Sequence, residues 1–483
     1  MMPTLPRLLV LLLPLVLLMA CQTPEDPPID HEARMAQIET ALRPLFTIQG
    51  EPPATTSLAE RMETLGVPGV SIAVIEGGEV AWARGYGFAD VEAERPVTPQ
   101  TLFQAASISK PVAATAALRL AQEGRLDLDT DVNAYLTSWQ VPDTAFTATE
   151  AVTIRRLVNH TAGTTVWGFP GYAPGEPVPS TADVLDGSGN TDPVRVYKTP
   201  GESWRYSGGG YTVMQLALHD LTTQPFPALM DSLILTPLGM TASTYQQPLP
   251  ADRHEQAAVG YRADGTAVEG RWHTYPEMAA AGLWTTPTDL ARYALAIQQA
   301  HRGTEGSILD AATTSAMLTP GFANHGLGPV ISADTLRFEH GGANEGYRCF
   351  MTASIEGDHG VVVMTNSDEG GRLGQEIAQM VAHVYGWAGP QAEEKTTTTL
   401  DAAAYEAVAG RYVLEDGRPI SVVYTADTLR IQADFLLEEI HLVPQSDTTF
   451  FNRFDGMSVV FSRTDGAVTD LLVANQVSGT RVE

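Results

Sequence analysis

Lysine is scarce in this chain of 483 residues: among 29 basic residues only Lys110, Lys198 and Lys395 are lysines. Basic charge as a whole is also low, because 57 acidic residues give a formal net charge of -28. A nucleic-acid-binding protein needs a basic face, so this composition excludes nucleic acid as a partner. Arginine keeps its proton where a lysine can lose one, so chemistry that needs a neutral amine is confined to these three lysines.

Cysteine is nearly absent, with Cys21 and Cys349 as the two residues of that type. Two cysteines cannot form a disulfide framework or a cysteine-rich zinc site. Hydrophobic residues make up 44% of the chain and charged residues 18%, which is typical of a globular protein. The length suits about three domains of ~150 residues, or one large domain with a small one.

A long run of strongly apolar residues is present only near the N-terminus, over 8–20, where it is interrupted by Pro14. This stretch is too short for a membrane-spanning helix of ~20 residues but suits the core of a signal peptide. It ends just before Cys21, in a pattern that resembles the bacterial lipobox, whose cysteine is lipidated. We therefore predict a lipoprotein signal peptide over 1–20, a lipid on Cys21 and a tether over 21–38. The protein is then exported and anchored to a bacterial membrane, facing the periplasm or the cell surface; an ordinary secretory signal is the alternative.

Hydrophobic patterns predict strands early and late in the chain, with helices between them. The expected strands are 70–75 and 80–83 of a hairpin over 69–87, and segments 328–331, 335–339, 347–354 and 361–365. The expected helices are 104–123, 153–159, 287–299 and 372–387. Strands that lie far apart in the sequence would share one sheet, so we predict a mixed α/β fold for a domain over 39–390.

The composition changes at 391–400, a segment rich in threonine and charge that indicates a linker. Beyond it, turn signals recur: Asp416-Gly417, Ala426-Asp427, Asp455-Gly456 and Asp465-Gly466. Short segments between regular turns are typical of small all-β modules. We predict a barrel-like domain over 401–483.

A serine and a lysine three residues apart open the first predicted helix, in Ser107-Ile108-Ser109-Lys110. Residues at this spacing share a helix face, and a helix N-terminus favours developing negative charge. To act as a base near neutral pH, the lysine pKa must fall by ~3 units from its ordinary value near 10.4. With 21 serines in the chain the spacing also arises by chance, and the alternative is that Lys110 is a solvated helix residue.

Further segments give this pair a context. They are the Gly-rich stretch Arg205-Tyr206-Ser207-Gly208-Gly209-Gly210-Tyr211, the strand segment Phe338-Glu339-His340-Gly341-Gly342-Ala343, and segments 157–163 and 280–291. In this order they resemble the motifs of the serine β-lactamase and DD-peptidase superfamily, most closely the class C β-lactamase-like serine hydrolases and esterases. The resemblance covers about residues 40–388. It implies an antiparallel sheet flanked by helices, with an additional all-helical part.

The resemblance also implies roles. Ser107 would be the nucleophile, Lys110 would help to take its proton, and Tyr206 would be the partner general base. His340 stands where the third motif usually has a lysine, and would orient substrate or support the base. The backbone N–H groups of Ser107 and Ala343 would form the oxyanion hole. The reaction that the resemblance implies is acyl transfer through a covalent acyl-enzyme.

No metal and no cofactor is expected. The chain has histidines at 160, 273, 325 and 340, but no two of them have a ligand spacing such as H-x-x-x-H. The resemblance assigns His160 a mainly structural role. Lys198 precedes Thr199-Pro200, which imitates the third motif but lacks its glycine and comes before Tyr206, so it is rejected.

One departure bears on the substrate. The family has an asparagine two residues after the tyrosine, where this chain has Gly208. That asparagine typically contacts the substrate amide, so its absence weakens β-lactam and peptide recognition and leaves esters or other acyl substrates open. Expected substrate-binding residues are Gly208, Gly341, Gly342, Trp167 and Tyr172. Local packing is the alternative for Trp167 and Tyr172, and for Phe169 between them.

The leading hypothesis is a serine hydrolase of the esterase or amidase type, acting on a small-molecule or peptidoglycan-like acyl substrate. D-alanyl carboxypeptidase and β-lactamase activity are the alternatives within this class. A different class is a non-catalytic, penicillin-binding-like lipoprotein used for binding or sensing. A binding module needs neither Ser107, Lys110 nor Tyr206, so their presence argues for the hydrolase.

Overall fold

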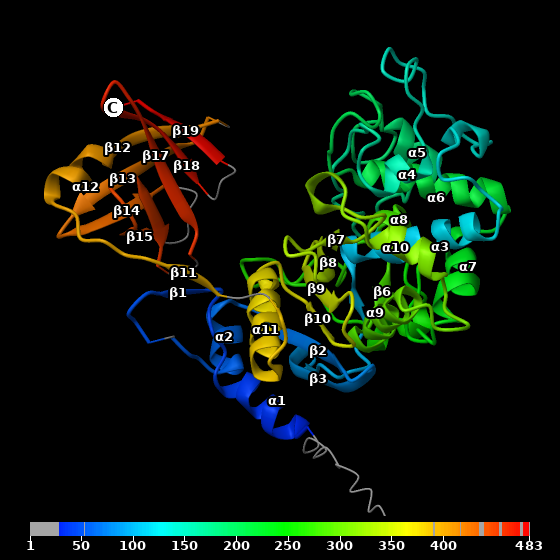
Figure 1. Cartoon of the computed structure of the whole chain (residues 1–483), viewed down its shortest axis with the longest axis horizontal. Coiled ribbons are helices and arrows are strands. Elements are labelled where there is room, and N and C mark those ends of the chain that lie inside the picture. The colour runs from blue at the N-terminus through cyan, green and yellow to red at the C-terminus, as the bar shows by residue number, and fades with distance from the viewer. Residues whose placement is uncertain are drawn as a thin grey trace, which may run out of the picture.

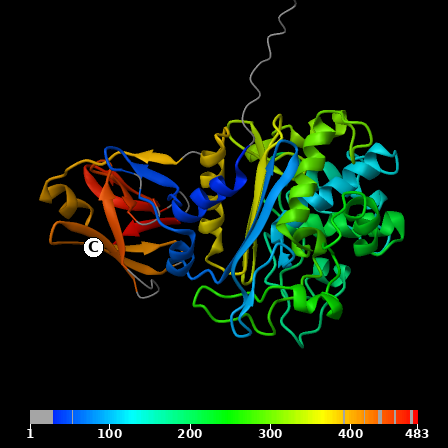
Figure 2. The same cartoon turned by 90° about the horizontal axis from the view of Figure 1, so that it is seen from below.

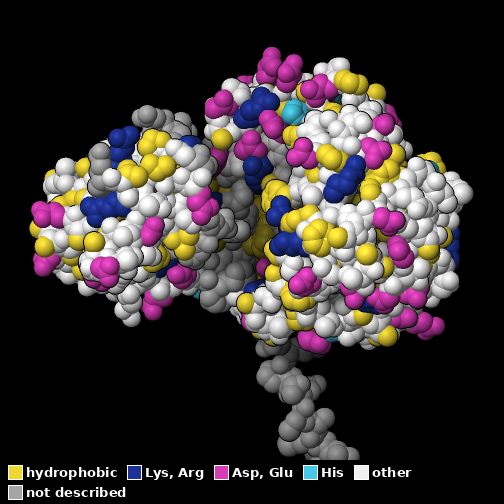
Figure 3. All heavy atoms as spheres, turned by 90° about the horizontal axis from the view of Figure 1, so that it is seen from above, with side chains coloured by type: hydrophobic (Ala, Val, Ile, Leu, Met, Phe, Trp, Pro, Cys, Tyr) yellow, Lys and Arg dark blue, Asp and Glu magenta, His cyan; other side chains and the backbone are white. Residues whose placement is uncertain are grey.

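The computed structural model describes residues 29–52, 54–389, 392–415, 417–433, 439–453, 456–473 and 477–482. The predicted signal peptide and Cys21 lie outside these residues. Two bodies stand side by side, a large α/β body and a smaller C-terminal barrel (Figures 1 and 2). A hollow separates them on one face, and acidic side chains are spread over both (Figure 3).

A seven-stranded sheet forms the centre of the large body, in the order β4-β3-β2-β10-β9-β8-β7. Its strands are β2 (Gly69–Glu76), β3 (Glu79–Asp90), β4 (Arg95–Pro96), β7 (Val330–Ile331), β8 (Arg337–Asn344), β9 (Tyr347–Ser354) and β10 (Gly360–Thr365). All neighbouring strands are antiparallel. The early strand β2 pairs with the late strand β10, so the predicted sharing of one sheet by distant strands is confirmed.

Helices cover both faces of this sheet (Figure 2). They are α1 (His31–Thr40), α2 (Leu58–Thr64), α3 (Ser109–Gln122), α4 (Ile154–Val158), α5 (Thr181–Asp186), α6 (Gly208–Thr222), α7 (Phe226–Met230), α8 (Met278–Ala281), α9 (Pro287–His301), α10 (Ala311–Leu318) and α11 (Gly370–Tyr385). Short 3-10 or π turns are η1 (Ala106–Ile108), η2 (Val132–Ala134), η3 (Asp231–Leu235), η4 (Ala251–Gln256) and η5 (Phe322–Asn324). Among the described residues, no helix is both long and apolar enough to cross a bilayer.

The two faces of the sheet have separate cores. On one face α1, α2 and α11 pack on β2 and β10 through residues such as Ile38, Val363 and Ile377. On the other face α9 and the helical part form the larger core, which includes α3 and α6. Strand β2 contributes alternate side chains to the two cores, because it is buried on both faces.

The C-terminal residues form a closed eight-stranded barrel. Its strands are β12 (Gly410–Leu414), β13 (Pro419–Thr425), β14 (Thr428–Gln432), β15 (Ile440–Pro444), β16 (Thr449–Asn452), β17 (Ser458–Thr464), β18 (Ala467–Val473) and β19 (Val477–Arg481), preceded by α12 (Ala402–Val408). Ala426-Asp427 and Asp465-Gly466 lie in the turns after β13 and β17, as expected; the other two predicted turns include undescribed residues. The predicted mixed α/β fold with a barrel-like C-terminal domain is confirmed.

The segment between the two bodies is more ordered than a linker. Strand β11 (Glu393–Lys395) lies within the predicted linker and pairs in parallel with β1 (Phe46–Ile48) from the N-terminal part of the chain. The ring of Phe46 then meets Phe451 of the barrel edge to face. A strand pairing between segments so distant in sequence gives no local pattern, so it was not predicted. A short two-stranded pair, β5 (Phe103–Gln104) with β6 (Trp284–Thr285), precedes the Ser107 turn.

Candidate active site

The turn η1 carries Ser107 directly into helix α3, so Ser107 and Lys110 share the start of one helical segment. The predicted helix over 104–123 was thus too long at its N-terminal end. Strand β8 passes close to this turn, since a Cβ on Gly342 would lie 2.2 Å from the carbonyl oxygen of Ala105. Glycine at 342 is therefore required to bring the strand against the serine turn.

Lys110 is buried, with 2% of its surface exposed. Its Nζ lies 2.9 Å from Ser107 Oγ and donates to the carbonyl oxygen of Ala280 at 2.7 Å. Within the described part of the chain no carboxylate pairs with it. Burial without a counter-charge lowers the pKa of Lys110 to about 7. The amine can therefore be neutral near physiological pH, which is the property that the predicted base requires.

Tyr206 stands beside this pair, just before helix α6, and Lys110 Nζ lies 4.9 Å from the centre of its ring. Burial raises the pKa of Tyr206 well above its ordinary value, and a hydrogen bond with Ser107 opposes this only in part. The next residue, Ser207, caps α6 by accepting a hydrogen bond from Gly210 N at 3.0 Å. Tyr206 is thus held at a capped helix start and keeps its proton at neutral pH.

His160 packs behind Tyr206, with ring centroids 4.3 Å apart. Its Nδ1 accepts a hydrogen bond from the backbone N–H of Ser207 at 3.1 Å. Burial, followed by the neighbouring His325, Lys110 and His340, holds the pKa of His160 well below its ordinary value. A neutral ring in this position supports the tyrosine by packing and is one layer removed from Ser107.

His340 lies in the middle of β8, whereas the strand was predicted to end at residue 339. Its ring centroid is 6.4 Å from that of Tyr206, and its Nδ1 bonds the carbonyl oxygen of Gly341 at 2.6 Å. Burial lowers the pKa of His340 to about 3, so the ring is neutral at physiological pH. It therefore brings no positive charge to the place of the third-motif lysine.

Ser107 opens into a cavity of about 270 Å³. It is lined by Ser107, Lys110, Trp167, Gly168, Phe169, Pro170, Tyr206, Ala280, Ala281, Ala343 and Asn344. The two predicted oxyanion residues thus face one space from two elements, Ser107 from η1 and Ala343 from β8. Lys110 and Tyr206 complete the wall beside the serine.

The predicted substrate-binding residues divide into two groups. Trp167 lines the cavity, is 66% exposed, and lies 5.4 Å from the Tyr206 ring between centroids. Tyr172, Gly208, Gly341 and Gly342 are not among its lining residues. Tyr172 is buried elsewhere, where its hydroxyl accepts a hydrogen bond from Asn190 N. Tyr172 was misplaced because a Gly- and Pro-rich loop shows no periodicity from which its direction could be predicted.

Gly208 packs against the loop that carries Trp167 and Phe169. A Cβ there would be 2.9 Å from Phe169 Cε2, and the N–H of Gly208 donates to the carbonyl oxygen of Trp167 at 3.0 Å. The Phe169 ring therefore occupies the space into which a longer side chain at 208 would extend. The absence of an asparagine at 208 and the position of the Phe169 ring are therefore linked, because both side chains would need the same space.

Asn344 is a cavity residue that the sequence reasoning missed. Its Nδ2 donates to Gln104 Oε1 at 2.7 Å and to the carbonyl oxygen of Ala281 at 3.1 Å, which fixes its side chain at the cavity wall. Strand alternation carries the signal that would have found it, because 340, 342 and 344 share one face of β8. The signal was lost when the strand was ended at residue 339.

The remaining predicted candidates for metal ligands are His325, which lies close to the site, and His273, which does not. His325 is 5.2 Å from His160 between ring centroids, and burial lowers the pKa of His325. His273 is elsewhere, with its Nδ1 on the carbonyl oxygen of Pro170. In the parts of the chain that the structure describes, no three His, Cys, Asp or Glu side chains are placed to hold a metal ion.

Comparisons with known proteins agree with this geometry. The model of a family described as Beta-lactamase matches residues 55–385. Penicillin-binding protein 4* of Bacillus subtilis is 23% identical over 428 residues, which cover 83% of this chain and 92% of that protein. Protein flp of Staphylococcus aureus is 26% identical over 349 residues, 66% of this chain; the match spans only 62% of that protein.

Solved structures share the fold along most of the chain. The octameric penicillin-binding protein homologue from Pyrococcus abyssi superposes with a TM-score of 0.62 at 24% identity, covering 88% of this chain and 98% of that one. The structure of SurE gives a TM-score of 0.56 at 22% identity, with 88% and 97% covered. At these identities the likeness establishes the fold alone.

Proposed function

The chain belongs to the beta-lactamase family, and we propose that it is a serine hydrolase that transfers an acyl group to Ser107 and then to water. The observation that carries this proposal is the 2.9 Å contact between Ser107 Oγ and Lys110 Nζ. The lysine is buried without a carboxylate partner and its pKa is lowered to about 7, so the contact joins a nucleophile to a base.

In acylation, neutral Lys110 accepts the Ser107 hydroxyl proton while its own N–H remains on the carbonyl oxygen of Ala280. Ser107 Oγ attacks the carbonyl carbon of a substrate in the 270 Å³ cavity. The N–H groups of Ser107 and Ala343 would stabilise the oxyanion, at about 3–4 kcal/mol for a donor. The proton on Lys110 then passes to the leaving group. In deacylation, water attacks the acyl carbon while Lys110 accepts a water proton, and this proton returns to Ser107 Oγ as the acid leaves.

Tyr206 acts in this proposal as a protonated relay. Burial raises its pKa, so a free phenolate at neutral pH is disfavoured relative to a neutral Lys110. A phenol that contacts Ser107 can pass a proton between the lysine and the leaving group without holding a charge in the resting enzyme.

We propose an ester with an apolar acyl group as the substrate class. The Phe169 ring fills the space beside Gly208, and Trp167 extends the same aromatic wall. Gly208 provides no side-chain amide for an acylamino substrate, and neutral His340 offers no cation for a substrate carboxylate. Both features suit an uncharged ester better than a β-lactam or a D-alanyl peptide.

A fluorophosphonate probe on wild type and Ser107→Ala tests the hydrolase directly. We expect Ser107-dependent labelling and turnover of p-nitrophenyl esters, with lower activity on nitrocefin and on a D-Ala-D-Ala peptide. Turnover mainly of nitrocefin or of the peptide would assign the β-lactamase or carboxypeptidase alternative. Absence of Ser107-dependent labelling and of ester turnover would favour the binding module.

Phe169→Ala tests the substrate class. We expect kcat/KM to fall about tenfold for long or aromatic acyl esters, since a pocket group contributes about 1–3 kcal/mol, and to change little for acetate. Phe146→Ala is the matched control, because Phe146 is exposed and does not line the cavity. An equal loss on acetate and long esters would refute the acyl-wall role.

Gly208→Asn, with and without Phe169→Ala, tests whether the Phe169 ring occupies the space that an asparagine at 208 would need. Alone, the asparagine collides with Phe169 and should give no gain on nitrocefin. Combined with Phe169→Ala it has room, and any gain in nitrocefin turnover should appear only in the double variant. A gain in the single variant would show that Phe169 does not occupy the asparagine space.

We also propose that the protein is exported and anchored by a lipid on Cys21, which places the site on the outer side of a bacterial membrane. The support is the 8–20 apolar run followed by Cys21. Radioactive fatty acid should label wild type but not Cys21→Ala. Equal labelling of both would overturn the anchor.

A further inference from the structure

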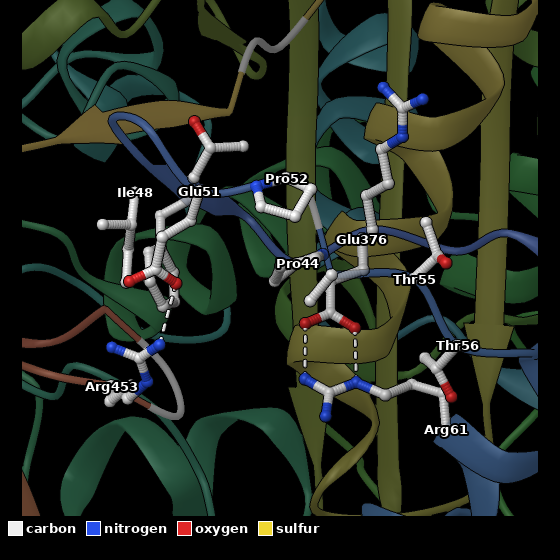
Figure 4. A pocket seen from close by; sticks show the side chains of 13 residues that line it. Pro44, Ile48, Glu51, Pro52, Thr55, Thr56, Arg61, Glu376 and Arg453 are labelled. Carbon is white, nitrogen blue, oxygen red and sulfur yellow. Dashed lines mark hydrogen bonds and ion pairs between the residues drawn. The ribbon is translucent and has the colours of Figure 1, made fainter.

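A second cavity, of about 230 Å³, lies between the large body and the barrel (Figure 4). Most of its wall comes from the N-terminal segment 43–56. Arg61 of α2, Glu376 of α11 and Arg453 of the barrel complete it. It lies on the face of the sheet covered by α2 and α11, opposite the helical part that carries Ser107 (Figure 1). This cavity is therefore distinct from the proposed active site.

The carboxylates of this cavity are already paired. Glu376 is 1% exposed and accepts hydrogen bonds from Arg61 Nε at 2.8 Å and Nη2 at 2.6 Å. It also accepts from Arg372 Nε at 2.8 Å. On the facing wall Glu51 pairs with Arg453 at 2.8 Å, and Figure 4 shows both pairs across the cavity. The lining residues include three arginines, Arg43, Arg61 and Arg453, and two carboxylates, Glu51 and Glu376.

Arg43 adds a cation without a partner. In the described residues its guanidinium makes no hydrogen bond or ion pair, and its Nε is buried. Glu60 is a further carboxylate bonded to a lining residue: it accepts a hydrogen bond from the Thr56 hydroxyl and two from Ser57, the N-cap residue of α2. Removing a guanidinium nitrogen from water without a partner is unfavourable, and a bound anion would relieve that cost.

The rest of the wall is apolar or carries hydroxyls. Apolar lining comes from Pro44, Phe46, Ile48, Pro52 and Ala54, and threonines at 47, 55 and 56 supply hydroxyl groups. The volume is just below the range of about 300–1,000 Å³ for drug-sized ligands. Arginine recognises planar carboxylates well because its fork can donate two parallel hydrogen bonds.

We propose that this cavity is a binding site for a small organic carboxylate, with the anion on Arg43 and the apolar part of the ligand against Phe46 and Ile48. The site combines an unpaired guanidinium with an apolar wall, so it distinguishes such a ligand from both an inorganic anion and a neutral molecule of the same shape. Because the wall includes Arg453, the ligand also contacts the barrel.

Calorimetric titration of the full chain with benzoate tests the proposal. We expect a Kd of about 1 mM or lower for wild type, and at least about tenfold weaker binding for Arg43→Gln. Arg43→Lys keeps the charge without the fork and should lie between the two. Arg411→Gln is the matched control, since Arg411 is an exposed barrel arginine outside the cavity, and its affinity should equal that of wild type.

Benzamide and inorganic phosphate complete the test. Benzamide, the neutral analogue, should bind at least about tenfold more weakly than benzoate. Equal binding of benzoate to Arg43→Gln and wild type, equal binding of benzamide, or tighter binding of phosphate would each overturn the proposal, as would no heat of benzoate binding.

Ester hydrolysis by Arg43→Gln should stay within about twofold of wild type, which shows that the variant is folded and that the site is separate. An inactive wild type would refute the proposed hydrolase function without affecting the benzoate result.

Discussion

Two lysines are buried in this protein, and their surroundings differ. Lys110 at the Ser107 cavity and Lys395 at the junction with the barrel are 2% and 3% exposed. Lys395 pairs with Glu393 at 2.8 Å and lies 5.4 Å from the centre of the Phe451 ring. Among the residues that the structure describes, the hydrogen-bond partners of Lys110 Nζ are the Ser107 hydroxyl and the Ala280 carbonyl oxygen.

This difference shows that burial alone does not create a base. Lys395 lies beside the Glu393 carboxylate at the junction with the barrel. An aromatic ring does not distinguish the two lysines, because Lys110 Nζ lies 4.9 Å from the centre of the Tyr206 ring. In the described part of the chain no carboxylate pairs with Lys110, so burial lowers its pKa and its proton can leave. Both lysines are buried, but only Lys110 lies beside the proposed nucleophile, the Ser107 hydroxyl.

Removal of the Lys110 amine should have the largest effect. Lys110→Met and Lys110→Arg should lower kcat/KM on p-nitrophenyl esters by about 10²–10⁴-fold, because neither side chain can accept the Ser107 proton near pH 7. Lys395→Met should stay within about twofold of wild type, since it lies at the junction. Near wild-type activity in Lys110→Arg would show that the lysine is not the base.

Lys110→Met should be more stable than wild type. Burial lowers the pKa of Lys110 from 10.5 to about 7. Each unit of pKa shift corresponds to about 1.4 kcal/mol, so the stability lost by burying this amine has an upper limit near 5 kcal/mol. Because the variant also loses two hydrogen bonds, we expect a gain of about 1–3 kcal/mol in the free energy of unfolding near pH 7. Urea unfolding measures it.

The pH dependence of that gain provides its control. The unfolded chain holds the lysine proton up to about pH 10.5, whereas the folded protein releases it near pH 7. Wild-type stability therefore rises with pH across this window relative to Lys110→Met, and the gain should shrink by about pH 10. A gain of equal size at both pH values would mean that packing, and not charge, is responsible.

Activity should follow the titration of Lys110. The neutral amine is the active form, so kcat/KM should fall about tenfold per pH unit below the pKa of about 7 and level off above it. Tyr206 keeps its proton across this range, since burial raises its pKa. Lys395→Met should leave the midpoint unchanged. A flat profile for Ser107-dependent hydrolysis between about pH 5 and 8 would contradict the assignment of the base.

Glu393→Gln should have the smallest effect and act on stability alone. Without the carboxylate, the Lys395 amine retains its contact with the Phe451 ring. Because the Glu393 side chain is largely exposed and water screens its charge, we expect a loss of about 0.5–1 kcal/mol in the free energy of unfolding, measured with urea. Adding Lys395→Met should restore part of the loss, because it removes the unpaired charge. If Glu393→Gln is as stable as wild type, the ion pair does not hold the junction.

Local patterns were enough to predict some of the site. The S-x-x-K spacing put Ser107 and Lys110 on one helical segment, and they are in contact. Residues whose placement depends on other segments were harder. Asn344 enters the cavity because β8 continues past the glycines, and Tyr172 leaves it because its loop pairs with Thr274.

The junction was missed for the same reason. A threonine-rich segment indicates a linker by composition, yet its Glu393–Lys395 part forms β11 with β1. That pairing joins residues more than three hundred positions apart, so no window of sequence contains it. The cavity beside it, formed by Arg43, Glu376 and Arg453, has no sequence signature either.

By itself the sequence predicted the mixed α/β fold class and the contact between Ser107 and Lys110, which follow from periodicity and spacing and are local. The other residues proposed for acyl transfer were implied by the resemblance of the motifs to a known family. The tertiary structure decided which lysine meets a counter-charge, because a carboxylate, a hydroxyl or a carbonyl reaches a buried amine only when distant segments pack together. Burial without a carboxylate partner made Lys110 the candidate base, whereas Lys395 is buried beside Glu393 and forms an ion pair at the barrel junction.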